Sequence, residues 1–186
     1  MGDLTTLAKV KEFLGIGDTA TDAVLTTLVS QVSAAVEAHC RRTFADTNYT
    51  EHHDGDLARE IPLRQYPIIS ITSVHEDTAR TFAASALISA DDYTFNGPSG
   101  ILLIDYRLPR GNRNVKVVYR AGYATLPPDV VLATNAWVGA IYNRRKSGGS
   151  MSESLGNFST SYEVGPMPAD VAKMLDSYVM AESSIA

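Results

Sequence analysis

The residues best able to do chemistry in this sequence are acids and histidines gathered between positions 51 and 56. Glu51, His52, His53, Asp54 and Asp56 offer carboxylate and imidazole groups of the kind that bind divalent cations in metal-dependent hydrolases. If this segment is a strand, however, His52 and His53 point to opposite faces. The run from Asp54 to Asp56 is typical of a solvated turn. We therefore expect a polar turn here, with a metal-dependent hydrolase as an alternative hypothesis.

Two further patterns are found in enzymes, and each has a simpler explanation. Residues 15–20 (Gly-Ile-Gly-Asp-Thr-Ala) fit the G-x-G-x-x-A fingerprint of dinucleotide sites, which works only after a strand. Here it follows a helical repeat, so we expect a corner between two helices. His39 and Cys40 lie about 100° apart on a helix and cannot easily bind one ion, and Cys40 is expected to be a small buried hydrophobe. Because no G-x-S-x-G motif is present either, we predict no enzymatic activity, no metal and no cofactor.

Positive charge gathers at three places in the sequence. Two clusters are expected at helix ends, where cations interact favourably with the helix dipole, and the third lies in one turn. The simplest interpretation is dipole complementation and solubility; the alternative is a surface that faces a partner or DNA. Aromatic residues do not alternate with the arginines, so a stacking platform for single strands is not indicated. The candidate DNA-facing or interface residues are Arg41, Arg42, Arg107, Arg110 and Arg113, and the candidate partner-binding residues at the other helix end are Arg144, Arg145 and Lys146.

The composition of the chain excludes several classes of protein. The chain has 186 residues, 45% of them hydrophobic, which suits one folded domain and excludes global disorder. A single cysteine excludes an internal disulfide scaffold, and no apolar run approaches the roughly 20 residues of a transmembrane helix. A net charge of −5 argues against a dedicated DNA-binding protein. Because no secretory signal begins the sequence, we expect an intracellular protein with no membrane partner.

Helical patterns fill the first segment, residues 1–46. A short helix is expected between a cap at Thr5 or Thr6 and Gly15. A longer helix is expected over residues 22–42, because its apolar residues recur with the 3.6-residue period of a helix. That apolar stripe consists of Leu25, Leu28, Val29, Val32, Ala35, Val36 and Cys40.

Strand and turn patterns replace the helical ones in residues 47–124. Residues 93–95 and 101–104 flank the turn sequence Asn-Gly-Pro-Ser-Gly at 96–100, which predicts a hairpin. Val115, Val117 and Tyr119 alternate with Lys116, Val118 and Arg120, which predicts a further strand. We expect four or five short strands to form a small antiparallel unit inserted between the helices.

Helices return in the last segment, residues 125–186. Pro127 and Pro128 are expected to open a helix that ends at residues 144–146, and Pro168 is expected to open a final one. Between them, residues 147–166 hold six serines and four glycines, and a loop of this length is usually functional or disordered. We predict a flexible loop that orders on a partner, as does the short C-terminal tail. The candidate partner-binding residues there are Ser150, Met151, Leu155, Phe158, Tyr162, Ser183 and Ile185.

These segments together predict the fold class. We expect a mainly α protein with a small inserted antiparallel β region (α+β), built on a bundle of about four helices. All of residues 1–186 are expected to form a single domain, because the strands look inserted between helices that must pack on one another.

The order and spacing of the segments resemble a known family. The resemblance spans nearly the whole chain, although each segment alone is unspecific. The segments that carry it are residues 36–42 (VEAHCRR), 61–71 (IPLRQYPIISI), 117–123 (VVYRAGY), 126–130 (LPPDV), 142–145 (YNRR) and 168–171 (PADV). In this order they resemble the head–tail connector proteins, also called adaptor or head-completion proteins, of tailed bacteriophages and prophages.

The resemblance implies a structural virion protein rather than an enzyme. Family members assemble as rings of about twelve subunits beneath the portal of a DNA-filled head. They extend the DNA channel and provide the docking surface for the next neck or tail component, so the implied partners are the portal, a downstream completion protein and further copies of the chain. DNA is expected to pass through without specific recognition. The implied location is the virion neck, with assembly in the cytoplasm of the host bacterium.

A small DNA-binding module that uses the arginine clusters remains the main alternative to a connector. It predicts DNA binding that weakens steeply as salt rises, because each neutralised phosphate releases a counterion. A connector whose channel wall is mildly acidic predicts the opposite behaviour, since the wall would repel phosphate and let DNA slide.

Overall fold

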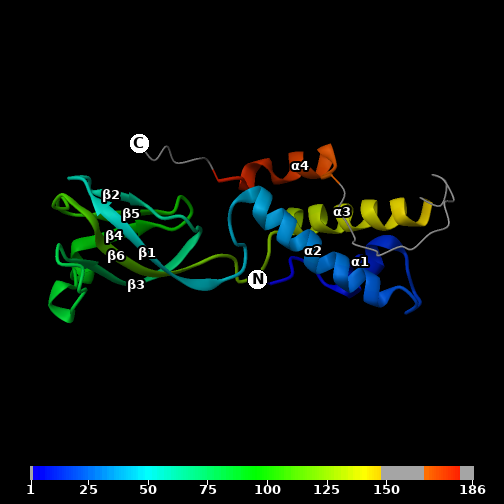
Figure 1. Ribbon diagram of the computed structural model, residues 1–186, viewed down its shortest axis with the longest axis horizontal. Helices are drawn as coiled ribbons and strands as arrows, with labels where there is room; N and C mark the ends of the chain where they lie inside the picture. Colours follow the sequence, from blue (N-terminus) through cyan, green and yellow to red (C-terminus); the bar gives the residue numbers. More distant parts are fainter. Residues whose placement is uncertain (1, 148–165, 181–186) are drawn as a thin grey trace, which may run out of the picture. The chain divides into compact units, whose positions relative to one another are not determined.

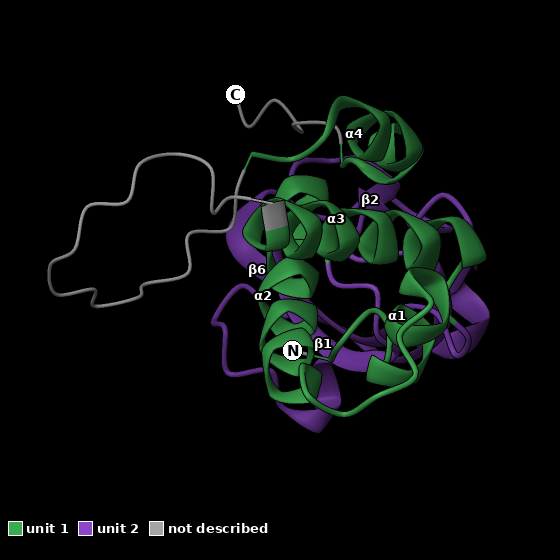
Figure 2. Cartoon of the chain, turned by 90° about the vertical axis from the view of Figure 1, so that its right-hand side faces the viewer, with its two compact units in different colours: residues 1–42, 126–186 green, residues 43–125 purple. Residues whose placement is uncertain are grey.

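The computed structural model describes residues 2–147 and 166–180, and it divides the chain into two compact units. Unit 1 comprises Met1–Arg42 together with Leu126–Ala186, and unit 2 is the intervening segment Thr43–Thr125 (Figure 2). The sequence predicts a β-rich insert over residues 47–124, which is close to the bounds of unit 2. The prediction that both units belong to a single domain stays a prediction. In the part of the chain that is described, no helix is long and apolar enough to span a bilayer.

The first two helices of unit 1 are bounded by residues that cap them through a side chain or through a left-handed backbone conformation. α1 (Leu7–Leu14) starts after Thr6, whose hydroxyl accepts a hydrogen bond from the Lys9 amide at 3.3 Å, and ends at Gly15 with φ of 66°. α2 (Asp22–Cys40) ends two residues before our expected limit, because Arg41 adopts the left-handed conformation with φ of 55°. Residues 15–20 therefore form the predicted helix corner and follow no strand.

The C-terminal half of unit 1 adds two further helices. α3 (Pro128–Ser147) opens at the predicted prolines and packs on α2. α4 (Ala169–Leu175) follows Pro168, packs on α3 and continues into the 3-10 helix η4 (Asp176–Tyr178). Buried polar contacts also hold the N-terminus in place: the Thr5 hydroxyl donates to Asn135 Oδ1 at 2.6 Å. The apolar interior of the unit includes Leu4, Val10, Leu25, Leu28, Val29, Val32, Val36, Val130, Ala133, Val138, Val171 and Leu175.

Unit 2 contains two three-stranded antiparallel sheets (Figure 1). In the first sheet the central strand β6 (Gly111–Ala121) pairs with β1 (Thr47–Gly55) and with β3 (Ile68–Glu76). In the second, β5 (Ile101–Ile104) pairs with β2 (Glu60–Pro62) and with β4 (Tyr93–Asn96). The β4–β5 hairpin is the one predicted from the turn sequence at 96–100, and two short 3-10 helices, η1 (Ala84–Ala86) and η2 (Ala90–Asp92), precede it.

Both sheets contribute to one apolar core inside unit 2. Val115, Val117 and Tyr119 alternate along β6 and are all fully buried, as the sequence pattern predicts. Leu102 and Ile104 of β5 join them from the second sheet. The remaining buried members are Ile61, Leu63, Ile68, Val74, Ile88, Leu108 and Ala121.

The expected fold class, a mainly α bundle of about four helices with a small β region, is therefore wrong. The four α-helices exist in the described residues, but α1 has only 8 residues and α4 only 7, whereas six strands build two sheets around a core of their own. The helical period was easy to recognise because it is local. The sheets depend on pairing between distant segments, such as Thr47 with Ala121, which no local pattern reports.

Candidate interaction surfaces

The C-terminal end of α3 forms a basic, partly apolar surface of unit 1. Arg144, Arg145 and Lys146 occupy the last turn of α3 and are all exposed. Together with Val24 of α2 and Tyr142 of α3, the last two line a surface hollow. We call these five residues the basic end. The sequence predicts the three cations in a last helical turn, and the structure adds the partly apolar hollow beside Arg145 and Lys146.

The hollow at the basic end continues along one face of α2. Ala23, Thr27 and Leu28 line an adjoining hollow that shares Val24 with the first. Ala23 and Thr27 are exposed and Leu28 is buried, so the surface has an apolar base that side chains only partly fill. A basic rim beside an apolar hollow suits a protein surface of opposite charge.

The two arginines at the end of α2 have different surroundings. Arg41 is exposed, and its backbone amide caps the helix by donating to the carbonyl of Ala38 at 3.3 Å. Arg42 is only 4% exposed and lies in the interior of unit 1, as does Glu37 at 3%. Arg41 is therefore the member of this pair that reaches solvent.

The third arginine cluster spans the connection before β6 and the start of that strand. Arg107 and Arg110 lie on the connection and Arg113 is the third residue of β6, so the predicted single turn does not hold all three, although all three are exposed. The Arg113 amide donates to Asp54 Oδ1 at 2.6 Å, and Asp54 and Asp56 share an open hollow with Arg110. Acids and arginines thus alternate on this surface of unit 2.

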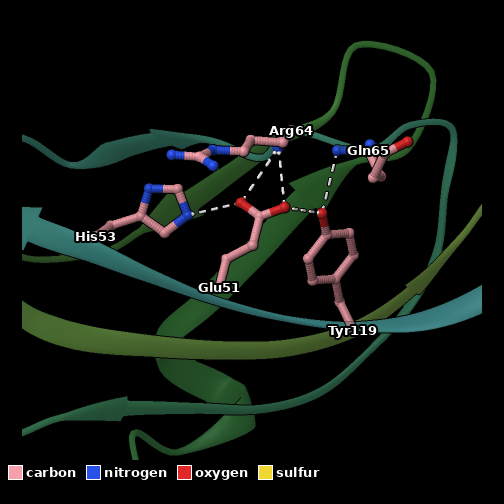
Figure 3. Close-up of polar contacts among 5 residues, drawn as sticks. All are labelled: Glu51, His53, Arg64, Gln65 and Tyr119. Atoms are coloured by element: carbon pink, nitrogen blue, oxygen red, sulfur yellow. Dashed lines mark hydrogen bonds and ion pairs between the residues drawn. The ribbon is translucent and has the colours of Figure 1, made fainter. Parts of the chain in front are cut away.

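Glu51, placed in the candidate metal cluster, lies at the centre of a hydrogen-bonded network in unit 2 (Figure 3). His53 Nε2 lies 3.0 Å from one carboxylate oxygen, and the Tyr119 hydroxyl donates to the other. The backbone amide of Arg64 contacts both oxygens at 3.2 and 3.3 Å, and the amide of Gln65 donates to the Tyr119 hydroxyl at 3.1 Å. The network fastens the loop after β2 to strands β1 and β6.

The electrostatics of this network favour a charged Glu51 and a neutral Tyr119. Burial disfavours the charged carboxylate, but hydrogen bonds from His53, Tyr119 and the Arg64 amide outweigh it and lower the pKa of Glu51. Burial and the adjacent Glu51 carboxylate raise the pKa of Tyr119 far above its ordinary range. Glu51 is thus fully engaged by protein donors.

The other predicted metal ligands are dispersed. His52 points to the opposite face of the strand from His53, as expected, and its ring lies 5.2 Å from that of Phe82. Asp56 accepts a hydrogen bond from the Ala58 amide at 2.9 Å, within its own turn. Over residues 2–147 and 166–180, no three His, Cys, Asp or Glu side chains are grouped so that they could hold a metal ion.

A row of basic side chains across the first sheet was missed by the sequence analysis. Lys116 of β6 lies in register with His52 of β1 and with His75 of β3. Its ammonium group also lies 5.2 Å from the centre of the Phe82 ring. Burial, followed by the positive charge of nearby groups that include Lys116, lowers the pKa of both histidines. The row depends on strand register, which the sequence alone does not reveal.

Several predicted partner-binding residues lie outside the described residues, and the proposal for them is unchanged. They are Ser150, Met151, Leu155, Phe158, Tyr162, Ser183 and Ile185.

Comparisons with known proteins find similar solved structures and one family model. No curated protein sequence matches the chain. Among solved structures, a chain from the neck of an empty GTA particle computed with C6 symmetry is similar in fold, with a TM-score of 0.62, 15% identity and coverage of 97% of this chain and 91% of that one. A chain from the virion of a native gene transfer agent (GTA) particle has a TM-score of 0.60 and a sequence identity of 15%. A chain from the neck of a native GTA particle computed with C12 symmetry has a TM-score of 0.60 and an identity of 14%, and both matches have the same coverage as the first. Residues 3–181 match the family described as head completion protein, HCP, so the chain belongs to the head completion protein family.

Proposed function

We propose that this head completion protein, whose role is structural at the head–tail connection, works as one subunit of a ring in the neck of a phage particle. The observation that carries the proposal is the family match over residues 3–181. The likeness in fold to chains from GTA necks, which covers 97% of the chain, supports it. A ring of about twelve copies would dock beneath the portal, extend the DNA channel and offer a surface to the next neck or tail component.

The described surfaces suit assembly better than catalysis. The most polar cluster of unit 2 is occupied with its own hydrogen bonds, because Glu51 accepts from His53, Tyr119 and Arg64. The basic end of unit 1 combines exposed cations with an apolar hollow, which is the composition of a protein-binding surface. The proposal therefore gives the chain a structural rather than an enzymatic role.

The charge of the chain supports passage of DNA without retention. A net charge of −5 provides no excess of cations to neutralise phosphates. Arg110 and Arg113 of unit 2 lie beside Asp54 and Asp56, which oppose their attraction for DNA. An assembled ring should therefore not retard duplex DNA at physiological salt, whereas binding that weakens steeply with salt would favour the DNA-binding module.

The direct test is assembly with the portal protein of the same particle. Particle mass is measured by mass photometry for the chain alone, the portal alone and the mixture, and the mixture is imaged by electron microscopy. We expect a ring of the chain on one end of the portal. An unrelated acidic protein of similar size serves as the control. A chain that remains monomeric and ignores the portal at micromolar concentration would overturn the proposal.

A further inference from the structure

Unit 1 carries a second exposed surface at the opposite end of α3 from the basic end. It comprises Asp129 and Leu132 of α3, Asp170 and Met174 of α4, and Asp176 of η4, and we call it the acidic end. α3 has 20 residues, so its two ends lie about 30 Å apart at 1.5 Å per residue. α3 thus presents a negative charge in its first turn and positive charges in its last turn.

The acidic end is a built surface within unit 1. The Tyr178 hydroxyl lies 2.8 and 2.9 Å from the two carboxylate oxygens of Asp129, which fastens η4 to the first turn of α3. Asp170 and Met174 are four residues apart on α4 and therefore share one face of that helix. Leu132 is 45% exposed and Met174 is 37% exposed, so each of the two helices that carry these carboxylates also presents a large apolar side chain to solvent.

Helix-dipole complementation does not account for these two surfaces. It explains Asp129 and Asp170 in first turns, but Asp176 caps the C-terminal end of α4, where a negative charge is unfavourable. The dipole also gives no reason for the exposure of Leu132 and Met174. Nor does it explain the apolar hollow next to Arg145 and Lys146 at the other end of the unit.

We propose that the basic end of one copy binds the acidic end of the next copy, and that this junction repeats around the ring. The inference rests on the proposed function. A closed ring is built from heterologous contacts, so each subunit needs two different and mutually complementary surfaces. Asp129, Asp170 and Asp176 outnumber Lys173, the exposed lysine that lies among them on α4, and would face Arg144 and Lys146. The exposed Leu132 and Met174 would cover the apolar hollow beside Val24.

A second copy fits these surfaces better than DNA does. Duplex phosphates would match the cations at the end of α3, but they would leave the apolar hollow beside them uncovered. They would also give no role to the acidic end, where Leu132 and Met174 are exposed. Only a partner with both carboxylates and apolar side chains matches both features, and the chain itself carries such a surface.

The test reverses charge at each end and then restores complementarity. The first variant is Arg144→Glu/Lys146→Glu and the second is Asp170→Lys/Asp176→Lys. Ring formation on the portal is followed by mass photometry at the concentration where the unaltered chain assembles. We expect each variant alone to need at least tenfold more protein to assemble, because like charges then meet at every junction. An equal mixture should recover assembly as a ring of alternating copies, since every junction again pairs opposite charges.

Recovery in the mixture also shows that both variants fold. The matched control for the basic-end variant is Lys9→Glu/Arg59→Glu, which makes the same change in net charge at two exposed positions that belong to neither surface, and it should assemble like the unaltered chain. Normal assembly of the two charge-reversal variants would overturn the junction while the ring itself stands. Failure of the mixture as well as the single variants would also overturn it. A basic-end variant that assembles normally but loses affinity for duplex DNA would assign that surface to DNA instead. If the unaltered chain forms no ring on the portal, the proposed function fails and the junction fails with it.

Discussion

The hydroxyl of Tyr119 in β6 donates a hydrogen bond to the carboxylate of Glu51 in β1, across 68 positions of sequence. Tyr119 is fully buried, and its oxygen also accepts a hydrogen bond from the Gln65 amide. One hydroxyl therefore joins two strands of the first sheet to the loop that follows β2. This contact is the centre of the polar network on which the following two predictions depend.

Tyr119→Phe should destabilise the protein by about 1–3 kcal/mol, because the substitution leaves the Gln65 amide without its acceptor and removes the hydroxyl that donates to Glu51. The measurement is the midpoint and slope of urea unfolding. Tyr93→Phe is the matched control, since burial alone raises the pKa of Tyr93 and its hydroxyl has no hydrogen-bond partner among the described residues, so the unfolding midpoint should hardly change. Equal effects of the two substitutions would contradict the role of the Tyr119 hydroxyl.

Glu51→Gln should remove a pH-dependent part of the stability. The pKa of Glu51 is lower in the folded chain than its ordinary value of 4.5, so the unfolded chain binds the proton more tightly. The stabilisation is therefore complete above pH 4.5 and is lost as the pH falls through the lower, folded-state pKa. The difference in unfolding free energy between the unaltered chain and the variant should be large at pH 7 and shrink in acid. A difference that is independent of pH would contradict the prediction.

The network also shows where sequence reasoning reaches its limit. The residues at 51–56 were recognised as chemically capable, and the opposite directions of His52 and His53 were predicted from strand geometry. The hydrogen-bond partners of Glu51 were not predicted, because Tyr119 and Arg64 approach it only through the register of β1 with β6 and the course of a loop. The same limit produced the error in fold class. Helical periods are local and were recovered, whereas the two sheets depend on pairing between distant segments.

Lys116→Gln should raise the pKa of both His52 and His75. Burial is the main cause of their lowered pKa values, and the ammonium group of Lys116 between them adds to it. Removing that charge leaves burial in place, so both pKa values should rise but stay below 6.5. The measurement is an NMR titration of the imidazole resonances. Lys9→Gln, on α1, should leave both titrations unchanged, and a shift there equal to that of Lys116→Gln would contradict the assignment.

The same two histidines should make the chain less stable in mild acid. Their pKa values are lower in the folded state than the ordinary 6.5, so the unfolded chain binds more protons. Their neutral forms are fully compatible with folding above pH 6.5, and stability should fall as the pH drops from there toward the folded-state values. In Lys116→Gln this fall should be shallower, which differential scanning calorimetry between pH 7.5 and 5.5 would detect as a smaller decrease in Tm.

Gly139→Leu should destabilise unit 1 by about 1–3 kcal/mol, because α1 crosses α3 closely at this position. A Cβ atom added there would already lie 3.1 Å from Leu14 Cδ2 and 3.4 Å from Phe13 Cε1, so a larger side chain must displace α1. Urea unfolding measures the effect. Gly17→Ala is the control, since a Cβ at Gly17 meets no atom within 4 Å in the described structure, and its unfolding midpoint should stay close to that of the unaltered chain. A stable Gly139→Leu variant would contradict the close packing of α1 on α3.

The single thiol of the chain should report the unfolding of unit 1. Cys40 is fully buried at the end of α2, and burial, opposed by Arg42 and reinforced by Glu37, raises its pKa to about 11. At pH 8 the thiolate fraction should therefore be roughly two orders of magnitude below that of an exposed cysteine, and burial slows the reaction further. The measurement is the alkylation rate with iodoacetamide, with the chain in 6 M guanidinium chloride as the control. Alkylation rates of the folded and unfolded chain within tenfold of each other would contradict the burial of Cys40. A slow alkylation rate in the charge-reversal variants without denaturant would show that unit 1 remains folded in them.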